Sequence, residues 1–278
     1  MKSDTIIDQF IRLFCTKDSE KFSDTEISKL LQKAVSPTIK KYEKGTKQHQ
    51  SRFKSKESID RLIVLRCYAY ELFESISNGN IHNEIYGQRI NVIESALLRC
   101  EVATDENICL VKSGFGLSFL SNLRLMLESF AIAKYLWEKG ETEAIRFQDY
   151  MEYQISEIEK TKRDLEGKYD KSFFKPYGWI SDSKINSLSK LVKKLNNDEY
   201  NELFKISSNY VHSSPYSLQK VWEMNQSLNG YFPFSLEDSI RLNEFILNDF
   251  LIFIIDCFAE DDKKDFFKLF LKVIVDNM

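Results

Sequence analysis

The sequence has few residues that break helices. Nine glycines and four prolines are spread over 278 residues, whereas leucine, isoleucine, lysine and glutamate are plentiful. No alternating apolar and polar pattern, which would indicate a half-buried β-strand, continues for more than a few positions. Few breakers and many helix formers favour long helices. The sequence therefore predicts an all-α protein built as a multi-helix bundle.

Cysteine and histidine are too sparse to suggest a metal centre. The five cysteines form no Cys-x-x-Cys pair and their number is odd, which disfavours both a zinc site and a disulfide framework. Only three histidines are present, and no acidic cluster lies on an apolar helix. Glycine-rich nucleotide-binding loops are absent as well. We expect no metal ion and no cofactor.

Long uncharged apolar runs are also missing. The most apolar late segment, Phe245–Phe258, is short and contains Asn248, Asp249 and Asp256, so it does not suit a membrane span. Ile6–Phe14 is too short for a signal peptide. The net charge of −3 gives no global basic field that would collect nucleic acid. Because scattered cysteines suit a reducing cytosol, we expect a cytoplasmic protein without membrane contact.

A basic stretch divides the chain into two parts. Between Lys40 and Lys56, the sequence carries seven lysines and arginines and almost no apolar residue. This stretch is either a solvated linker or an arm that touches phosphate. We interpret residues 1–56 as an N-terminal helical segment with a basic linker, and residues 57–278 as the main helical bundle domain.

Apolar residues recur at helical spacing along most of the chain. The expected helices are Thr5–Phe14, Ser23–Ala34, Ile59–Ile76, Ile85–Val102, Gly114–Trp137, Thr142–Leu165, Ser183–Leu195, Asp198–Ser213, Ile240–Phe258 and Lys263–Val275. Ser23-Asp-Thr-Glu predicts a capping box at the start of the second helix. The polar run Ala103–Asn107 is expected to separate the central helix from the one before it, and Gly140 to end it. The aromatic segment 167–181 is expected to be an irregular loop.

The chain is organised around the stretch Gly114–Trp137. A helix that is apolar on nearly every face belongs in a core, yet this one carries Ser121, Arg124 and Glu128. Spacings of three and four residues place these side chains on one stripe. A guanidinium and a carboxylate removed from water are costly unless they are paired. We therefore expect Arg124 and Glu128 to be coupled to each other or to His212.

Among the histidines, His212 is the best placed for chemistry. It falls at the C-terminal end of an expected helix, where the helix dipole favours the imidazolium form. Ser208 lies one turn before it. We expect the stripe of Ser208 and His212 to face Arg124 across a helix–helix contact. Arg146 and Tyr150, also one turn apart, are expected to complete this cluster.

Several short motifs occur in an order that resembles a known family. They are Arg124-x-x-x-Glu128, Tyr135-Leu-Trp, Ala144-x-Arg146-Phe-x-x-Tyr150, Trp179-Ile-Ser and the block Tyr200…Ser207-Ser-Asn-Tyr-Val-His212-Ser-Ser. Between roughly Ile59 and Phe258, the chain resembles a bacterial family of helical domains of unknown function. That family is similar to HEPN-type domains and often accompanies phage-defence genes. The resemblance implies a HEPN-like core with extra helices.

HEPN ribonucleases cleave RNA without a metal, with a histidine that moves a proton and an arginine that stabilises phosphate charge. The resemblance implies catalytic roles for Arg124, Glu128 and His212. We expect the other residues of the cluster, Ser121, Arg146, Tyr150 and Ser208, to bind the substrate. This chain departs from the HEPN pattern, in which the arginine and the histidine share one helix. Here Glu128 follows the arginine, and the histidine is expected on another helix.

Two classes of function follow from these observations. One is a HEPN-like effector in phage or stress defence that cuts RNA. The other is a non-enzymatic helical binding or dimerisation module, whose Arg/Glu/His network is structural. The resemblance implies RNA or a partner protein from the same operon as the ligand, and a homodimer. A cleavage site should open onto a basic groove, whereas a structural network should be sealed.

Overall fold

The computed structural model describes residues 23, 25–26, 28–29, 56–77, 87–113, 117–160, 167–211 and 236–277. The regular secondary structure within these ranges is helical and includes no β-strand, which confirms the predicted all-α class. The helices are α3 (Lys56–Ser77), α4 (Gln88–Ser113), α5 (Leu117–Lys139), α6 (Glu141–Glu159), α7 (Leu188–Val192), the 3-10 helix η2 (Lys193–Leu195), α8 (Asp198–Val211), α10 (Leu236–Phe258) and α11 (Asp261–Asn277).

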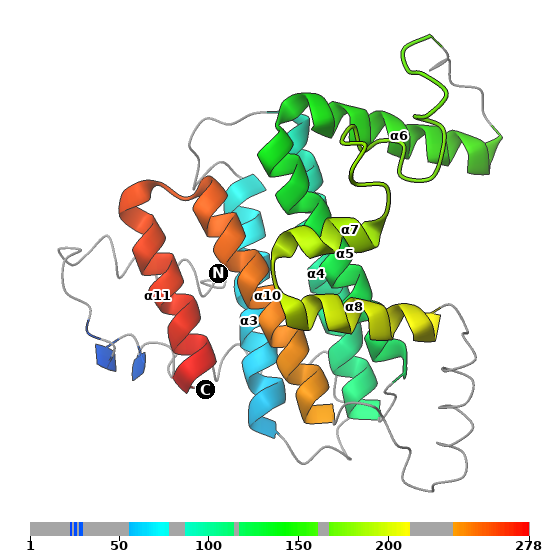
Figure 1. The fold of residues 1–278 in the computed structure, drawn as a ribbon. Helices are drawn as coiled ribbons and strands as arrows, with labels where there is room; N and C mark the ends of the chain where they lie inside the picture. The colour runs from blue at the N-terminus through cyan, green and yellow to red at the C-terminus, as the bar shows by residue number, and fades with distance from the viewer. Residues whose placement is uncertain are drawn as a thin grey trace, which may run out of the picture.

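Four long helices form the body of the bundle. In Figure 1, α3, α4, α5 and α10 lie alongside one another, and α11 packs on the outside against α3 and α10. The helices α7 and α8 pack on α5, and α6 leaves the end of the bundle at which α4 begins. Their buried side chains form one hydrophobic core. Within it, the rings of Phe130 and Phe250 stack with centroids 5.0 Å apart.

The central position belongs to α5. It packs against α4, α6, α7, α8 and α10, and Leu123, Leu127 and Leu136 are fully buried. This confirms that the apolar stretch is a core helix. Gly140 ends it as expected: its N–H donates to the Leu136 carbonyl at 2.9 Å. Its φ of 85° is a left-handed conformation that glycine adopts without strain.

Three predicted boundaries were wrong by five residues or more. The helix expected to reach Leu165 ends at Glu159, because Lys160 adopts a left-handed backbone conformation that closes α6. The run Ala103–Asn107 lies inside α4, because its polar side chains at 104 and 107 point into the protein and bond there. The helix expected from Ser183 begins only at Leu188. Asp182 forms a turn with the N–H groups that follow it, and the Ser187 side chain then caps α7.

The N-terminal segment is described only at a few positions. The predicted capping box is formed: Ser23 N–H donates to Glu26 Oε2 at 3.1 Å, and Glu26 N–H donates to Ser23 Oγ at 3.4 Å. The rest of residues 1–55, including most of the basic stretch, lies outside the described residues, so the domain division stays a prediction. Within the described ranges, no helix combines the length and apolar character that crossing a bilayer requires.

Candidate functional site

The ion pair on α5 is formed and faces α8. Arg124 Nε donates to Glu128 Oε1 at 2.8 Å, one helical turn away. The two side chains are only 14% and 16% exposed. The Arg124 guanidinium also lies over the ring of Phe204 in α8, with Cζ 5.1 Å from the ring centroid. Its charge is therefore matched by a carboxylate, and an aromatic ring faces the guanidinium.

The serine hydroxyls on this part of α8 bond their own helix. Ser208 Oγ donates to the Phe204 carbonyl at 2.6 Å, and Ser207 Oγ donates to the same oxygen at 3.1 Å. Ser207 is fully buried and Ser208 is half-buried. A serine hydroxyl that donates to a carbonyl of its own helix has its hydrogen-bond donor satisfied without a partner from another element. This geometry gives Ser208 a structural hydrogen bond close to the Arg124 contact.

Two further candidates complete the predicted cluster. Ser121 is half-buried on α5, one turn before Arg124. His212 follows Val211, the last residue of α8, and lies outside the described residues. Its position relative to Arg124 therefore stays a prediction.

Arg146 of α6 holds the aromatic loop 167–181. Its Nε donates to the Trp179 carbonyl at 2.9 Å, and its Nη2 donates to the Gly178 carbonyl at 2.7 Å. A guanidinium that binds two successive carbonyls fixes the path of the backbone between them. Arg146 is therefore placed to shape this loop, which is a different setting from the expected cluster with Arg124.

Tyr150 and Glu143 extend this attachment along α6. Tyr150 Oη donates to the Lys175 carbonyl at 3.1 Å. Glu143 is buried, and its Oε1 accepts the N–H of Ser181 at 2.7 Å. Spacings of three and four residues place Arg146, Tyr150 and Glu143 within two turns of α6. The spacing is visible in the sequence. Only the fold shows that the aromatic loop is the segment to which these side chains bond.

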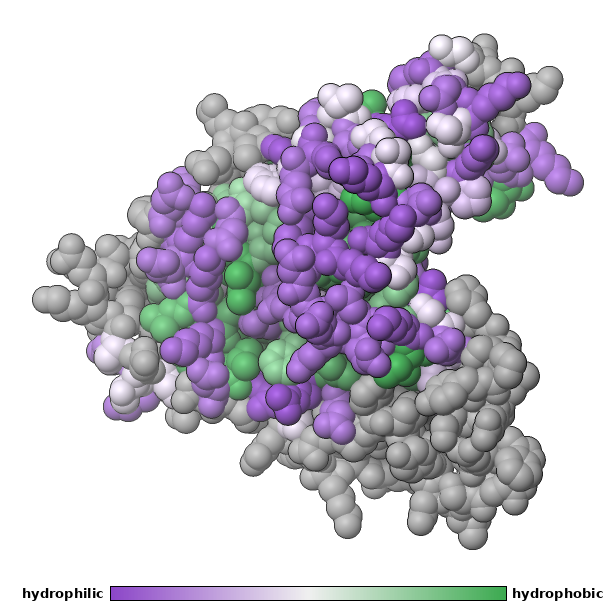
Figure 2. Space-filling view, viewed as in Figure 1, coloured by the Kyte–Doolittle hydropathy of each residue, from purple (hydrophilic) through white to green (hydrophobic). Residues whose placement is uncertain are grey.

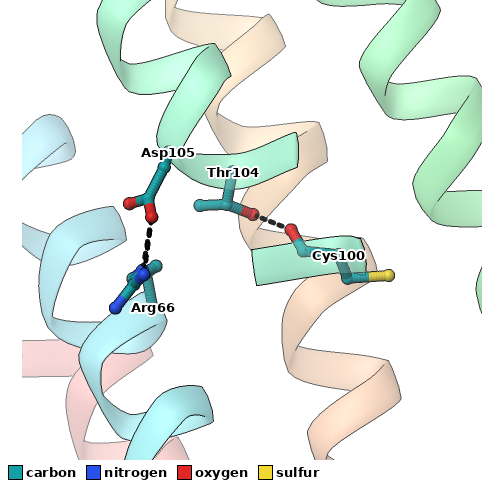
Figure 3. Close-up of polar contacts among 4 residues, drawn as sticks. All are labelled: Arg66, Cys100, Thr104 and Asp105. Atoms are coloured by element: carbon teal, nitrogen blue, oxygen red, sulfur yellow. Dashed lines mark hydrogen bonds and ion pairs between the residues drawn. The ribbon is translucent and has the colours of Figure 1, made fainter. Parts of the chain in front are cut away.

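Sequence reasoning missed a partly buried polar cluster between α3 and α4. Arg66 donates to Asp105 Oδ2 through Nη2 at 2.6 Å and through Nε at 2.9 Å (Figure 3). Glu101, one turn before Asp105, is fully buried, and neither of its carboxyl oxygens has a hydrogen-bond partner among the described residues. Burial raises the pKa of Glu101 to about 8, although Arg66 opposes the shift. A protonated Glu101 is therefore favoured at neutral pH.

A chain of hydrogen bonds crosses from α4 to α10. Asn107 Nδ2 donates to Asn243 Oδ1 at 2.7 Å, and Asn243 Nδ2 donates to Thr104 Oγ1 at 3.0 Å. Thr104 Oγ1 in turn donates to the Cys100 carbonyl at 2.8 Å, as Figure 3 shows. The three donor side chains are fully buried. The one feature of the sequence that could have indicated this chain of hydrogen bonds is Asn243, a polar residue within the apolar helix α10.

A cavity of about 300 Å³ lies between α8 and α10. Each helix lines it with residues at spacings of three and four, the face that one side of a helix presents. The lining residues are Glu199, Glu202, Leu203, Ile206, Asp238, Arg241, Leu242 and Phe245. Arg241 lies over the Phe245 ring, with Cζ 5.1 Å from its centroid. The cavity therefore combines apolar side chains with three carboxylates and one guanidinium.

Metal-ligand types do not gather in the described part of the chain: no three His, Cys, Asp or Glu side chains come together there in a geometry for a metal. The described cysteines Cys67, Cys100, Cys109 and Cys257 are free thiols. Burial raises the pKa of Cys100 and Cys257 above the usual value for a thiol. Protonated thiols are poor nucleophiles, so these two cysteines suit packing.

Comparison with known protein families places part of this chain. Residues 91–230, half of the chain, match a family of unknown function, DUF5677. The chain belongs to this family. The DUF5677 range includes every candidate residue from Ser121 to His212, whereas α3, α10 and α11 lie outside it. No curated protein and no solved structure matches the chain. The prediction of an uncharacterised family is therefore confirmed.

Proposed function

We propose that this DUF5677 protein is a helical binding module in which the Arg124–Glu128 network is structural. The observation that carries this proposal is the state of the Arg124 guanidinium, which is paired with Glu128 at 2.8 Å and lies over Phe204. An arginine that binds phosphate has to present its charge and its donors to the ligand. Here the neighbouring carboxylate already uses the Nε donor and neutralises the charge. A largely sealed ion pair is what a structural network requires.

The charge around α8 supports the same proposal. Three carboxylates, those of Glu199, Glu202 and Asp238, line the α8–α10 cavity beside one guanidinium, that of Arg241. Affinity for nucleic acid comes mainly from cations placed against phosphates. This cavity is therefore poorly suited to RNA. Apolar walls with a few polar groups are typical of sites that take a small molecule or a partner's side chain.

A HEPN-like ribonuclease is the second candidate, and one observation favours it. Arg124 lies against α8, whose last residue directly precedes His212. In this proposal the DUF5677 range contains a HEPN-like core, His212 moves a proton and Arg124 stabilises phosphate charge without a metal. Such a protein would act on RNA in the cytoplasm, as a homodimer or with a partner protein from its operon, in phage or stress defence.

One experiment separates the two candidates. Wild type, His212→Ala and Arg124→Ala are expressed in a bacterial host beside the control His82→Ala, a histidine outside the DUF5677 range. Growth and the integrity of total RNA are measured. The binding-module proposal expects intact RNA in all four strains. If wild type degrades RNA and His212→Ala lowers the purified protein's cleavage about 10²–10⁴-fold with EDTA present, the ribonuclease replaces it.

A further inference from the structure

One face of α6 carries apolar side chains from end to end. Ala144, Phe147, Met151, Ile155 and Ile158 follow one another at spacings of three and four residues, which places them on one stripe. Ala144 is fully buried and Phe147 half-buried against the bundle. The stripe then becomes open to solvent, because Met151 is 41%, Ile155 49% and Ile158 81% exposed. Among the residues that the structure describes, the second half of the stripe therefore has no covering partner.

The course of α6 explains this exposure. Its first turn is fixed to α4, where the N–H of Gln88 donates to Glu141 Oε1 at 2.6 Å. From there α6 runs away from the bundle, as Figure 1 shows. In Figure 2 the projecting part of the molecule carries hydrophobic atoms beside a hollow in the surface. The aromatic loop covers another face of α6, because it bonds to Arg146 and Tyr150.

A cavity marks the place where the stripe leaves the bundle. It has a volume of about 290 Å³ and is lined by Ser95 and Arg99 of α4 and by Met151 of α6, among others. Val102, 50% exposed, lies on the same face of α4 as Ser95 and Arg99 because the spacing is four and three residues. The cavity therefore meets the exposed part of the stripe at Met151, and the exposed Val102 lies further along the same face of α4.

The charges beside the stripe indicate what fits it. From Met151 to Glu159, α6 carries three glutamates and no lysine or arginine. Glu157 and Glu159 are exposed, and Glu152 is half-buried. Such carboxylates repel the phosphates of nucleic acids and of anionic lipid headgroups. They also disfavour a second copy of the same stripe, because pairing two copies would bring acidic flanks together.

We propose that this stripe, Met151–Ile155–Ile158, binds an amphipathic helix of a partner protein whose apolar face is flanked by lysines or arginines. Two packed helices contact each other through apolar residues at spacings of three and four on both partners, and Met151, Ile155 and Ile158 follow this spacing on α6. The flanking glutamates contribute specificity and speed of association through charge complementarity. This inference rests on the proposed function as a binding module and names the surface and the class of partner.

The test uses a synthetic amphipathic peptide of leucine and lysine, labelled with a fluorophore, and a matched peptide with glutamate in place of lysine. Binding to the full chain is measured by fluorescence anisotropy. The lysine peptide should bind and the glutamate peptide should not. Ile155→Ser with Ile158→Ser should raise the Kd at least about tenfold, because both side chains are expected anchors. Glu157→Lys with Glu159→Lys should reverse the preference between the peptides.

The matched control is Val211→Ser, which removes an apolar side chain of similar exposure, 43%, from α8. It should leave the Kd unchanged. Equal binding of the lysine peptide to wild type and to the double isoleucine variant would overturn the proposal, as would no binding at all. A wild-type dimer that the isoleucine changes convert to monomer would assign the stripe to a second copy instead. None of these results alters the RNA measurement, so the proposed function is tested separately.

Discussion

Asn107 of α4 donates a hydrogen bond of 2.7 Å to Asn243 of α10 inside the core. Asn243 Nδ2 in turn donates a hydrogen bond to Thr104 Oγ1. One side chain on α10 therefore joins two turns of α4. A slide of either helix would leave buried donors without acceptors, which is costly. The pair therefore ties the register of α10 to that of α4.

Replacing Asn243 should destabilise the fold. Asn243→Ala leaves the Asn107 donor unpaired in the core, so we expect a loss of about 1–3 kcal/mol in the free energy of unfolding, measured by urea denaturation. Asn209→Ala, at an exposed position on α8, is the control and should change stability by less than about 0.5 kcal/mol. Equal effects of the two substitutions would show that the buried hydrogen bonds carry no stability.

Glu101 should make stability depend on pH. Its pKa is about 8 in the fold against an ordinary value of 4.5, so between these values the folded state holds a proton that the unfolded state releases. The contribution of this group is therefore fully present below the unfolded pKa and is lost as the pH rises through the folded one. The slope reaches about 1.4 kcal/mol per pH unit at most.

Glu101→Gln replaces the titrating carboxyl group with an amide. It should therefore flatten the decline in the free energy of unfolding between about pH 5 and pH 9, which is measured by urea denaturation across this range. Glu106→Gln, at an exposed position on α4, is the matched control and should keep the wild-type slope. An unchanged slope in Glu101→Gln would mean that Glu101 is ionised in the folded protein at neutral pH.

Arg146 should protect the aromatic loop from proteases. Arg146→Ala removes both hydrogen bonds to the carbonyls of Gly178 and Trp179. We expect faster cleavage by trypsin after Lys171, which is exposed on this loop, because local opening exposes the backbone. Cleavage is followed by mass spectrometry, with Lys184→Ala as the control at an exposed position. Cleavage rates in Arg146→Ala equal to those of wild type would contradict the assigned role.

The sequence was sufficient for the helices but not for the direction of polar side chains within them. Periodicity identified α3, α5, α8, α10 and α11, because an apolar stripe alone positions such helices. Periodicity gave the wrong result at Thr104 and Asn107, because a short polar run has the same sequence pattern whether it lies in a core helix or in a linker. Only Asn243, more than a hundred residues away, distinguishes the two cases.

The candidate site shows the same limit. Arg124 and Glu128 were predicted to be coupled to each other or to His212. The first of these pairings is formed, because residues four apart on a helix are neighbours. Arg146 and Tyr150 were expected beside that pair, yet their donors bind carbonyls of the loop that follows α6. Sequence spacing gives the face that a side chain shares, whereas its partner depends on which segment packs there.

A double-mutant cycle on Arg124 and Glu128 tests the central claim, a structural ion pair at the α5–α8 contact, most directly. Unfolding free energies are measured for wild type, Arg124→Ala, Glu128→Ala and the double variant. A cycle on the exposed pair Lys205 and Glu202, 3.6 Å apart, is the control. We predict a coupling energy above about 0.5 kcal/mol for Arg124 and Glu128, and a smaller one for the control. Additive effects below about 1 kcal/mol, no larger than those of the control pair, would contradict the claim.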